Sequence, residues 1–158
     1  MNKTLINLNE LDLRRLAELN SSDRAFLSLY YTGKDGWEIE CKRMEKSQAL
    51  LKDQPEESEH LKRNLDLLKT ELKGLPNRYG NVVAFVCWLI DFCEVYTLPV
   101  PVPNFARIDS SPFIRPLAEL QDEYENYAVV VADNTMAKVY LVSSNIAKDE
   151  VSIKGNIK

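Results

Sequence analysis

The chain has 158 residues, of which 45% are hydrophobic and 28% are charged, and its formal net charge is −4. This is the composition of an ordinary globular protein, and the acidic balance excludes a generic basic coat for nucleic acid, although one local basic face for RNA stays open. No apolar run approaches the roughly 20 residues that span a membrane, and the N-terminal residues lack the pattern of a secretory signal. Three cysteines without C-x-x-C spacing predict reduced thiols, a cytoplasmic location and no zinc site.

The first segments predict a helix, a strand and a loop. Asn9 is the predicted N-cap of the helix, because a short polar side chain before an apolar periodic run caps helices. Ala25–Tyr31 is rich in aromatic residues and predicts a strand. Thr32–Gly36 carries two glycines and predicts a loop.

A long helical hairpin is predicted from Trp37 to Lys73. Pro55 suits the first turn of the second arm, and Gly74 with Pro76 ends it. The second arm has one apolar side at helical spacing, formed by Leu61, Leu65, Leu68 and Leu72.

Two paired strands, Val82–Ile90 and Glu94–Leu98, are predicted next. Three alternating prolines then exclude a helix or a central strand at 99–103, and predict an extended connector at a domain boundary. Ala106–Asp109 predicts a short strand, and Pro112–Asn126 predicts a helix capped by Ser110 or Ser111.

The segment from Tyr127 to Lys158 predicts three strands joined by tight turns. Such a meander has one apolar face, which we assign to Val129, Val131, Val139 and Leu141. That face needs a cover, and no helix follows. We therefore expect a fragment of a larger domain, whose uncovered face or edge pairs with a second copy of the chain.

Few residues suggest chemistry. His60 is the only histidine; it lies in an acidic stretch without a nucleophile beside it, so we interpret it as a solvated surface residue. No catalytic residue, metal site or cofactor site is predicted. The candidates for contact with rRNA or tRNA phosphates are the basic residues on or after the second hairpin arm: Lys62, Arg63, Lys69, Lys73 and Arg78. Interleaved carboxylates leave open the alternative of a solvated helix face with ion pairs between successive turns.

Several segments in order resemble the archaeal and eukaryotic class 1 peptide-chain release factor superfamily, which includes Pelota-like rescue proteins. Leu13–Tyr31 looks like the opening helix and Ser-Leu-Tyr strand of that family, and Trp37–Lys73 is similar to its decoding hairpin. Asn81–Cys87 looks like its next strand, and Glu119–Ile153 looks like the first part of its central domain.

The resemblance implies an α/β (α+β) fold class: an N-terminal release-factor-like domain over 1–104, with a small sheet and a long helical hairpin, followed over 105–158 by the first helix and three-strand meander of an incomplete central domain. It also implies a protein that enters the ribosomal A site, with rRNA and peptidyl-tRNA as partners and a translational GTPase as a further one. In the family a Gly-Gly-Gln loop after the meander promotes peptidyl-tRNA hydrolysis, and this chain ends before that place. A non-catalytic RNA- or protein-binding module that uses the hairpin is the alternative.

Two departures from the family bear on codon reading. Stop-codon readers carry Asn-Ile-Lys-Ser at the hairpin tip, whereas the tip here is Lys52, Asp53, Gln54, Pro55 and Glu56. The family's Tyr-x-Cys-x-x-x-Phe motif is replaced by the segment Ala106–Phe113, which lacks the tyrosine and the cysteine. We therefore expect ribosome rescue rather than stop-codon recognition.

Overall fold

The computed structural model describes residues 6–143 and 146–155. It contains helices and strands in the mixture that the sequence predicts, arranged around two antiparallel sheets. The elements in chain order are η1 (Leu8–Glu10), α1 (Leu13–Glu18), β1 (Phe26–Thr32), α2 (Gly33–Leu50), η2 (Leu51–Asp53), α3 (Pro55–Lys73), β2 (Asn81–Cys87), η3 (Trp88–Ile90), β3 (Phe92–Leu98), β4 (Phe105–Asp109), α4 (Arg115–Glu123), β5 (Tyr127–Ala132), β6 (Met136–Ser143) and β7 (Ile146–Lys154).

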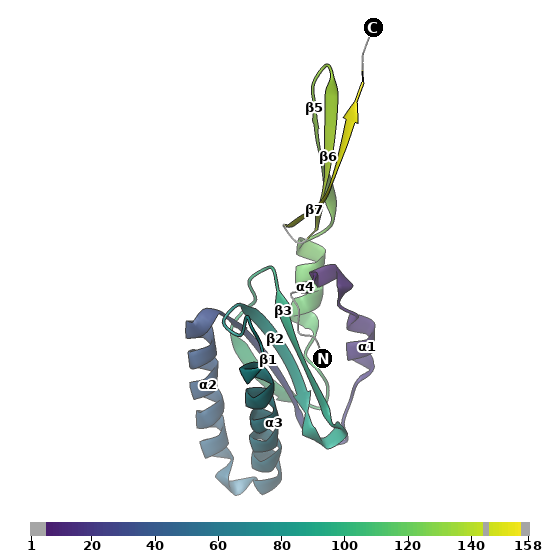
Figure 1. Ribbon diagram of the computed structural model, residues 1–158. Coiled ribbons are helices and arrows are strands. Elements are labelled where there is room, and N and C mark those ends of the chain that lie inside the picture. The colour runs from purple at the N-terminus through teal and green to yellow at the C-terminus, as the bar shows by residue number, and fades with distance from the viewer. Residues whose placement is uncertain (1–5, 144–145, 156–158) are drawn as a thin grey trace.

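The larger sheet has the strand order β3-β2-β1-β4 and is covered on both faces. The hairpin of α2 and α3 packs on one face, and α1 and α4 lie on the other (Figure 1). Side chains of β1 alternate between the two layers: Leu29 packs under the hairpin, whereas Tyr30 packs with the opposite core. The continuous apolar runs of β1 and β2 follow from this double burial.

The predicted hairpin is confirmed, and its first arm begins earlier than expected. The expected loop at 32–36 is wrong, because α2 starts at Gly33. Gly33 has a φ of 74°, which glycine adopts without strain, and its N–H donates to the carbonyl of Gly80 at 3.0 Å. Pro55 occupies the first turn of α3, and Gly74 caps its C-terminus, as predicted.

Three other boundaries differ from the sequence-based expectation. Asp12, rather than Asn9, caps α1, and its side chain accepts a hydrogen bond from the N–H of Arg15 at 3.0 Å. The strand expected to reach Ile90 ends at Cys87, because the N–H of Trp88 donates to Asn64 Oδ1 at 2.9 Å and leaves the ladder. The helix α4 is shorter than expected and has no side-chain cap from Ser110 or Ser111.

The proline connector leads back to the larger sheet rather than away from it. The strand β4 pairs with β1 over Phe26–Tyr30, so Phe105–Asp109 completes the larger sheet. Val102 holds the connector in place, because its N–H donates to Thr32 Oγ1 at 3.0 Å. The division into 1–104 and 105–158 stays a proposal about domains, but the larger sheet extends across it.

The three-strand meander is present, with the order β5-β6-β7 (Figure 1). Its register corrects the expected apolar face. Val130 pairs with Val139, which pairs with Val151, so these three side chains share one face. Val129 and Val131 lie on the opposite face, opposite Tyr140 and Lys138. The second turn of the meander falls largely on residues outside the described part of the chain.

The first helix of the hairpin carries a buried carboxylate. Glu40 of α2 has a side chain with 0% exposure, and its Oε1 accepts a hydrogen bond from Arg43 at 2.6 Å. Within the described part of the chain its other oxygen, Oε2, has no hydrogen-bond partner. Burial raises the pKa of Glu40 above its ordinary value, and the Arg43 charge opposes this shift.

The raised pKa of Glu40 predicts a pH-dependent effect of Glu40→Gln. The folded protein binds the Glu40 proton more readily than the unfolded chain, so wild type gains stability as pH falls from neutral toward 4.5, the ordinary pKa. We expect urea unfolding to show Glu40→Gln at least as stable as wild type at pH 7 and losing that advantage at pH 5. Glu45→Gln, an exposed position on the same helix, is the control. Equal destabilisation of Glu40→Gln at both pH values would contradict the burial argument.

Candidate nucleic-acid interface

The hairpin tip is an exposed acidic turn. The residues that were expected at a decoding-loop position, Lys52, Asp53, Gln54, Pro55 and Glu56, are all exposed. The short helix η2 ends at Asp53, and Pro55 and Glu56 open α3. Because carboxylates repel phosphates at short range, this tip disfavours close approach to an RNA backbone.

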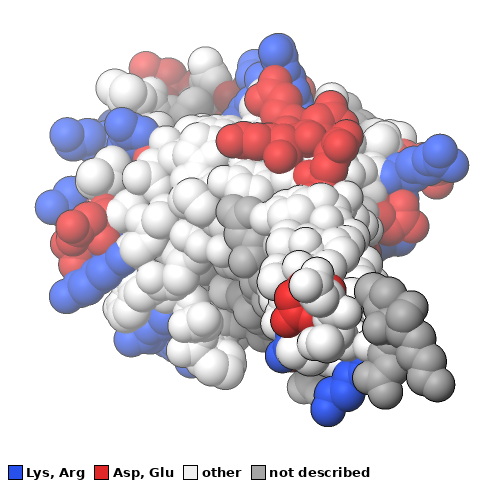
Figure 2. All heavy atoms as spheres, turned by 90° about the horizontal axis from the view of Figure 1, so that it is seen from above, with Lys and Arg blue, Asp and Glu red and all other residues white. Residues whose placement is uncertain are grey.

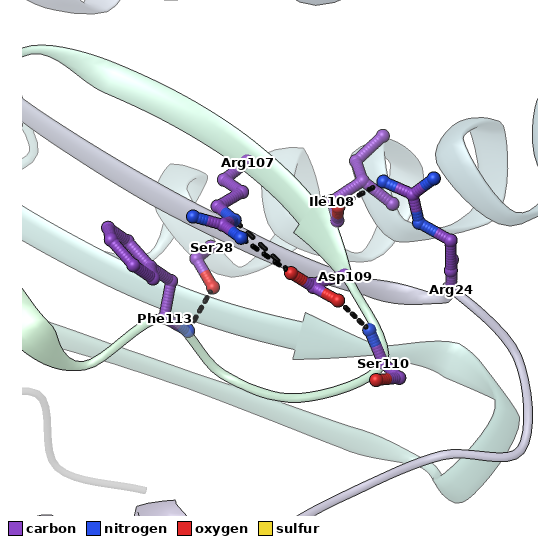
Figure 3. A network of polar contacts seen from close by, with 7 residues as sticks. All are labelled: Arg24, Ser28, Arg107, Ile108, Asp109, Ser110 and Phe113. Atoms are coloured by element: carbon purple, nitrogen blue, oxygen red, sulfur yellow. Dashed lines mark hydrogen bonds and ion pairs between the residues drawn. The ribbon is translucent and has the colours of Figure 1, made fainter.

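The segment that replaces the expected second decoding motif has a fixed polar network (Figure 3). Arg107 forms an ion pair with Asp109 at 2.9 Å, and Asp109 Oδ1 accepts a hydrogen bond from the N–H of Ser110 at 2.8 Å. These interactions, the Ser110 bond foremost, lower the pKa of Asp109. The N–H of Phe113 donates to Ser28 Oγ at 2.9 Å, and the Arg107 guanidinium lies 4.4 Å from the centre of the Phe113 ring. The polar groups of this turn are therefore largely satisfied by one another.

A groove of about 470 Å³ runs between this segment and the tip half of the hairpin. Its lining is mainly apolar, with Met44, Leu61 and Ile108 among the contributors. Arg24 and Arg107 add positive charge, and Glu57 adds one negative charge. Arg24 donates to the carbonyl of Ile108 at 3.5 Å (Figure 3). A concave surface with apolar walls and a few charged side chains has the form of a binding site.

The basic residues predicted from sequence separate into two groups. Arg63 donates to Glu59 at 2.6 Å and stacks over Trp88 at 4.1 Å, so it is engaged within the fold. Lys62 lies on the same stripe of α3 as Lys69, but seven residues nearer the tip, which is about 10 Å along a helix. In Figure 2 basic side chains are most frequent on the left, the side that the hairpin occupies in Figure 1.

Lys69, Lys73 and Arg78 come together at the end of the hairpin opposite the tip. They line a pocket of about 230 Å³ with Tyr31, Trp37 and Tyr79. Hereafter it is called the basic-aromatic pocket. Across the part of the chain that the structure describes, none of the three cations forms an ion pair with a carboxylate. The pocket therefore presents three positive charges without an ion pair to a carboxylate of residues 6–143 or 146–155.

The aromatic residues of the pocket are held in a fixed arrangement. The rings of Tyr31 and Trp37 lie 5.4 Å apart at 50°, and the Arg78 guanidinium lies 4.8 Å from the centre of the Tyr79 ring. Tyr31 is buried, and its hydroxyl donates to the carbonyl of Arg78 at 2.6 Å. Burial raises the pKa of Tyr31, so its hydroxyl stays protonated and keeps donating at neutral pH. This bond ties the loop that carries Arg78 and Tyr79 to the end of β1.

Sequence reasoning found the cations and missed the aromatic half of the pocket. Tyr31 is the last but one residue of β1, Trp37 lies in the second turn of α2, and Tyr79 follows α3 by six residues, so no local spacing connects them. The Arg78-Tyr79 dipeptide in an exposed loop is a signal that could have indicated the aromatic half, although only its arginine was predicted as a contact.

The interpretation of His60 as solvated is wrong. Its side chain is only 12% exposed, and its Nδ1 accepts a hydrogen bond from Trp88 Nε1 at 3.1 Å. Its Nε2 lies 3.8 Å from Asp23 Oδ2. These contacts join α3, η3 and the loop before β1, so the role of His60 is structural.

Two further properties of the described residues concern metal binding and membrane spanning. Over 6–143 and 146–155, no three His, Cys, Asp or Glu side chains lie close enough together to hold a metal ion. None of the helices in those ranges has the length and apolar character that crossing a bilayer requires.

Comparison with known proteins places the fold. No protein-family model matches the sequence, and no curated protein matches it significantly. Among solved structures, the chain is similar to the archaeal translation termination factor aRF1, with a TM-score of 0.61 and 16% identity over 98% of this chain and 46% of that protein. A structure described only as an archaeal protein matches with a TM-score of 0.60 and 16% identity, over 97% of this chain and 46% of its own. The chain thus spans less than half the length of each of these proteins, and the likeness is one of fold.

The anchoring role of the Tyr31 hydroxyl predicts the effect of Tyr31→Phe. Loss of the bond to the Arg78 carbonyl should lower the free energy of unfolding by about 1 kcal/mol and speed amide exchange over residues 74–80. Tyr30→Phe is a matched control, because Tyr30 is equally buried and its hydroxyl donates to the carbonyl of Phe113 at 2.5 Å on the other sheet face. If amide exchange over residues 74–80 rises as much in Tyr30→Phe as in Tyr31→Phe, the Tyr31 hydroxyl does not anchor this loop.

Proposed function

We propose that this chain is the ribosome-facing part of a translation termination or ribosome-rescue factor that enters the A site. The observation that carries the proposal is the fold shared with an archaeal translation termination factor over nearly the whole chain. The three cations of the basic-aromatic pocket support it, because unneutralised lysine and arginine side chains are the groups that bind RNA phosphates.

In this proposal the partners are rRNA and peptidyl-tRNA in the cytoplasm, and a translational GTPase delivers the factor. Peptidyl-tRNA hydrolysis is proposed for a longer protein that contains this chain, because the chain corresponds to less than half of each structural neighbour. The chain itself contributes binding and positioning.

The tip favours rescue over stop-codon reading. Asp53 and Glu56 are exposed at the turn, where a codon reader must approach mRNA. Carboxylates repel the phosphates of mRNA at short range. The tip therefore lacks the chemistry to hold a codon. A factor that binds without reading a codon is compatible with this tip.

The second candidate function is a non-catalytic binding module. The apolar groove beside β4, with Arg24 and Arg107, supports it, because such a groove accepts a peptide or a nucleic acid without chemistry. A longer protein that contains this chain and still releases no peptide would favour this candidate.

Ribosome co-sedimentation tests the proposal directly. We expect the chain to bind ribosomes at low salt, and Lys69→Gln/Lys73→Gln to reduce the slope of log affinity against log salt by about 1.4 to 1.8, the loss of two phosphate contacts. Lys62→Gln, on the same stripe of α3, should leave the slope nearly unchanged. Absence of ribosome binding by the wild-type chain at low salt would end the proposal.

Programmed ribosomes separate rescue from termination in the same assay. We expect equal affinity for ribosomes with a stop codon and with a sense codon in the A site, because the acidic tip cannot read the mRNA. A clear preference for the stop codon would contradict the rescue assignment and keep the termination assignment.

We also propose that two copies pair through the apolar face of the meander. Val130 is 63% exposed and Val151 is 55% exposed on that face. Analytical ultracentrifugation should show a dimer that Val130→Lys dissociates. Val131→Lys, on the opposite face of the same strand, should leave the dimer intact. A monomeric wild-type chain at high protein concentration would exclude the pairing.

A further inference from the structure

We propose that the basic-aromatic pocket binds one unpaired nucleotide of single-stranded RNA, with its base stacked on Trp37 and Tyr79 and its flanking phosphates on Lys69, Lys73 and Arg78. This inference rests on the proposed function, which makes RNA the partner, and it assigns to this pocket a ligand that the fold likeness does not specify.

The aromatic side of the pocket suits a base. Trp37 is half-buried and Tyr79 is 43% exposed, so both rings combine a fixed position with an accessible surface. Buried Tyr31 lies beside Trp37 and fixes the floor of the pocket. Aromatic side chains bind unpaired bases of any sequence by stacking on the face that every base presents.

The size of the pocket limits the ligand to one ring system. Its volume of about 230 Å³ is below the roughly 300–1,000 Å³ of pockets that enclose drug-sized molecules. A single base enters such a space, whereas a base pair does not. The bases of a duplex are already stacked and show only their edges, so double-stranded RNA cannot use the site.

The charges of the pocket add the contacts for phosphate. Lys69 and Lys73 are one helical turn apart on α3, and Arg78 faces the same pocket from the loop after the helix. The lining contains no Asp or Glu. A ligand with a flat ring between two negative groups complements this arrangement, and a nucleotide within a single strand has that form.

The pocket is formed before any ligand binds. The Tyr31 hydroxyl holds the Arg78 carbonyl, and the N–H of Gly80 donates to the carbonyl of Asn77 at 2.8 Å, which closes the turn behind Tyr79. Preorganised groups lose little freedom on binding, so the contacts that they make contribute more fully to affinity.

The experiment uses a single-stranded RNA pentamer with 2-aminopurine at its centre, whose fluorescence falls when the base stacks, and the same pentamer with a central abasic site. We expect the base-containing pentamer to bind about 5- to 160-fold more tightly than the abasic one, since stacking contributes about 1–3 kcal/mol per base. We also expect it to bind more tightly than a duplex of the same length.

Five variants assign the contacts. Tyr79→Ala and Trp37→Leu should reduce the affinity of the pentamer to the abasic level, and Tyr79→Phe should restore it. Lys69→Gln/Lys73→Gln should weaken both pentamers equally, while Lys62→Gln changes neither. Tyr79 is exposed, so Tyr79→Ala tests the proposal even where Trp37→Leu disturbs folding.

The outcomes separate this inference from the proposed function. Equal affinity for the base-containing and abasic pentamers, or tighter binding of a phosphotyrosine peptide than of RNA, would overturn the nucleotide pocket. If the wild-type chain still sediments with ribosomes in that case, the proposed function stands. Discrimination between the pentamers without ribosome binding would give the opposite result: the pocket stands and the proposed function fails.

Discussion

The burial of the four-stranded sheet on both faces is the constraint on which the rest of this structure depends. Every position of β1 from Phe26 to Tyr31 is buried, so any polar group in the layer needs a partner inside the protein. Asn64 of α3 supplies such partners, because its side-chain amide donates a hydrogen bond to the carbonyl of Ala25 at 2.6 Å and accepts one from the N–H of Trp88 at 2.9 Å. One amide of the hairpin thus links the residue that precedes β1 to the residue that follows β2. The same packing fixes the two ends of the hairpin relative to the sheet.

Those two ends differ in chemistry. The tip carries exposed carboxylates, and the opposite end carries three unneutralised cations with aromatic residues between them. The length of α3 keeps these regions about 25 Å apart, at 1.5 Å per residue. A polyanionic partner therefore attracts one end of the hairpin and repels the other, so that charge alone gives the hairpin a preferred direction on RNA. This polarity lies along the helix axis and is absent from the net charge of the chain.

Much of the fold follows from local patterns, and the remainder depends on contacts between distant segments. The leucine spacing of α3, Pro55 and Gly74 predict the hairpin because each acts within a few residues. The return of β4 to the larger sheet could not be predicted, because its partner β1 lies about 80 residues earlier in the chain. The face of the meander was assigned with a shift of one residue, because Val129, Val130 and Val131 are equally apolar and fit either register. The basic-aromatic pocket was half predicted for the same reason: its lysines lie on one helix, whereas its rings come from three separate elements.

The position of β1 inside the larger sheet has a consequence for synthesis of the chain. Its two neighbours, β2 and β4, begin at Asn81 and Phe105. During synthesis β1 is therefore made first and stays unpaired until these strands have been added. Translation adds about 5–20 residues each second, and β1 is therefore unpaired for several seconds after it emerges. The hairpin that follows can form from local contacts in microseconds and can shield one apolar side of β1 during the delay. In chain order the hairpin is therefore complete before either partner strand of β1 has been synthesised.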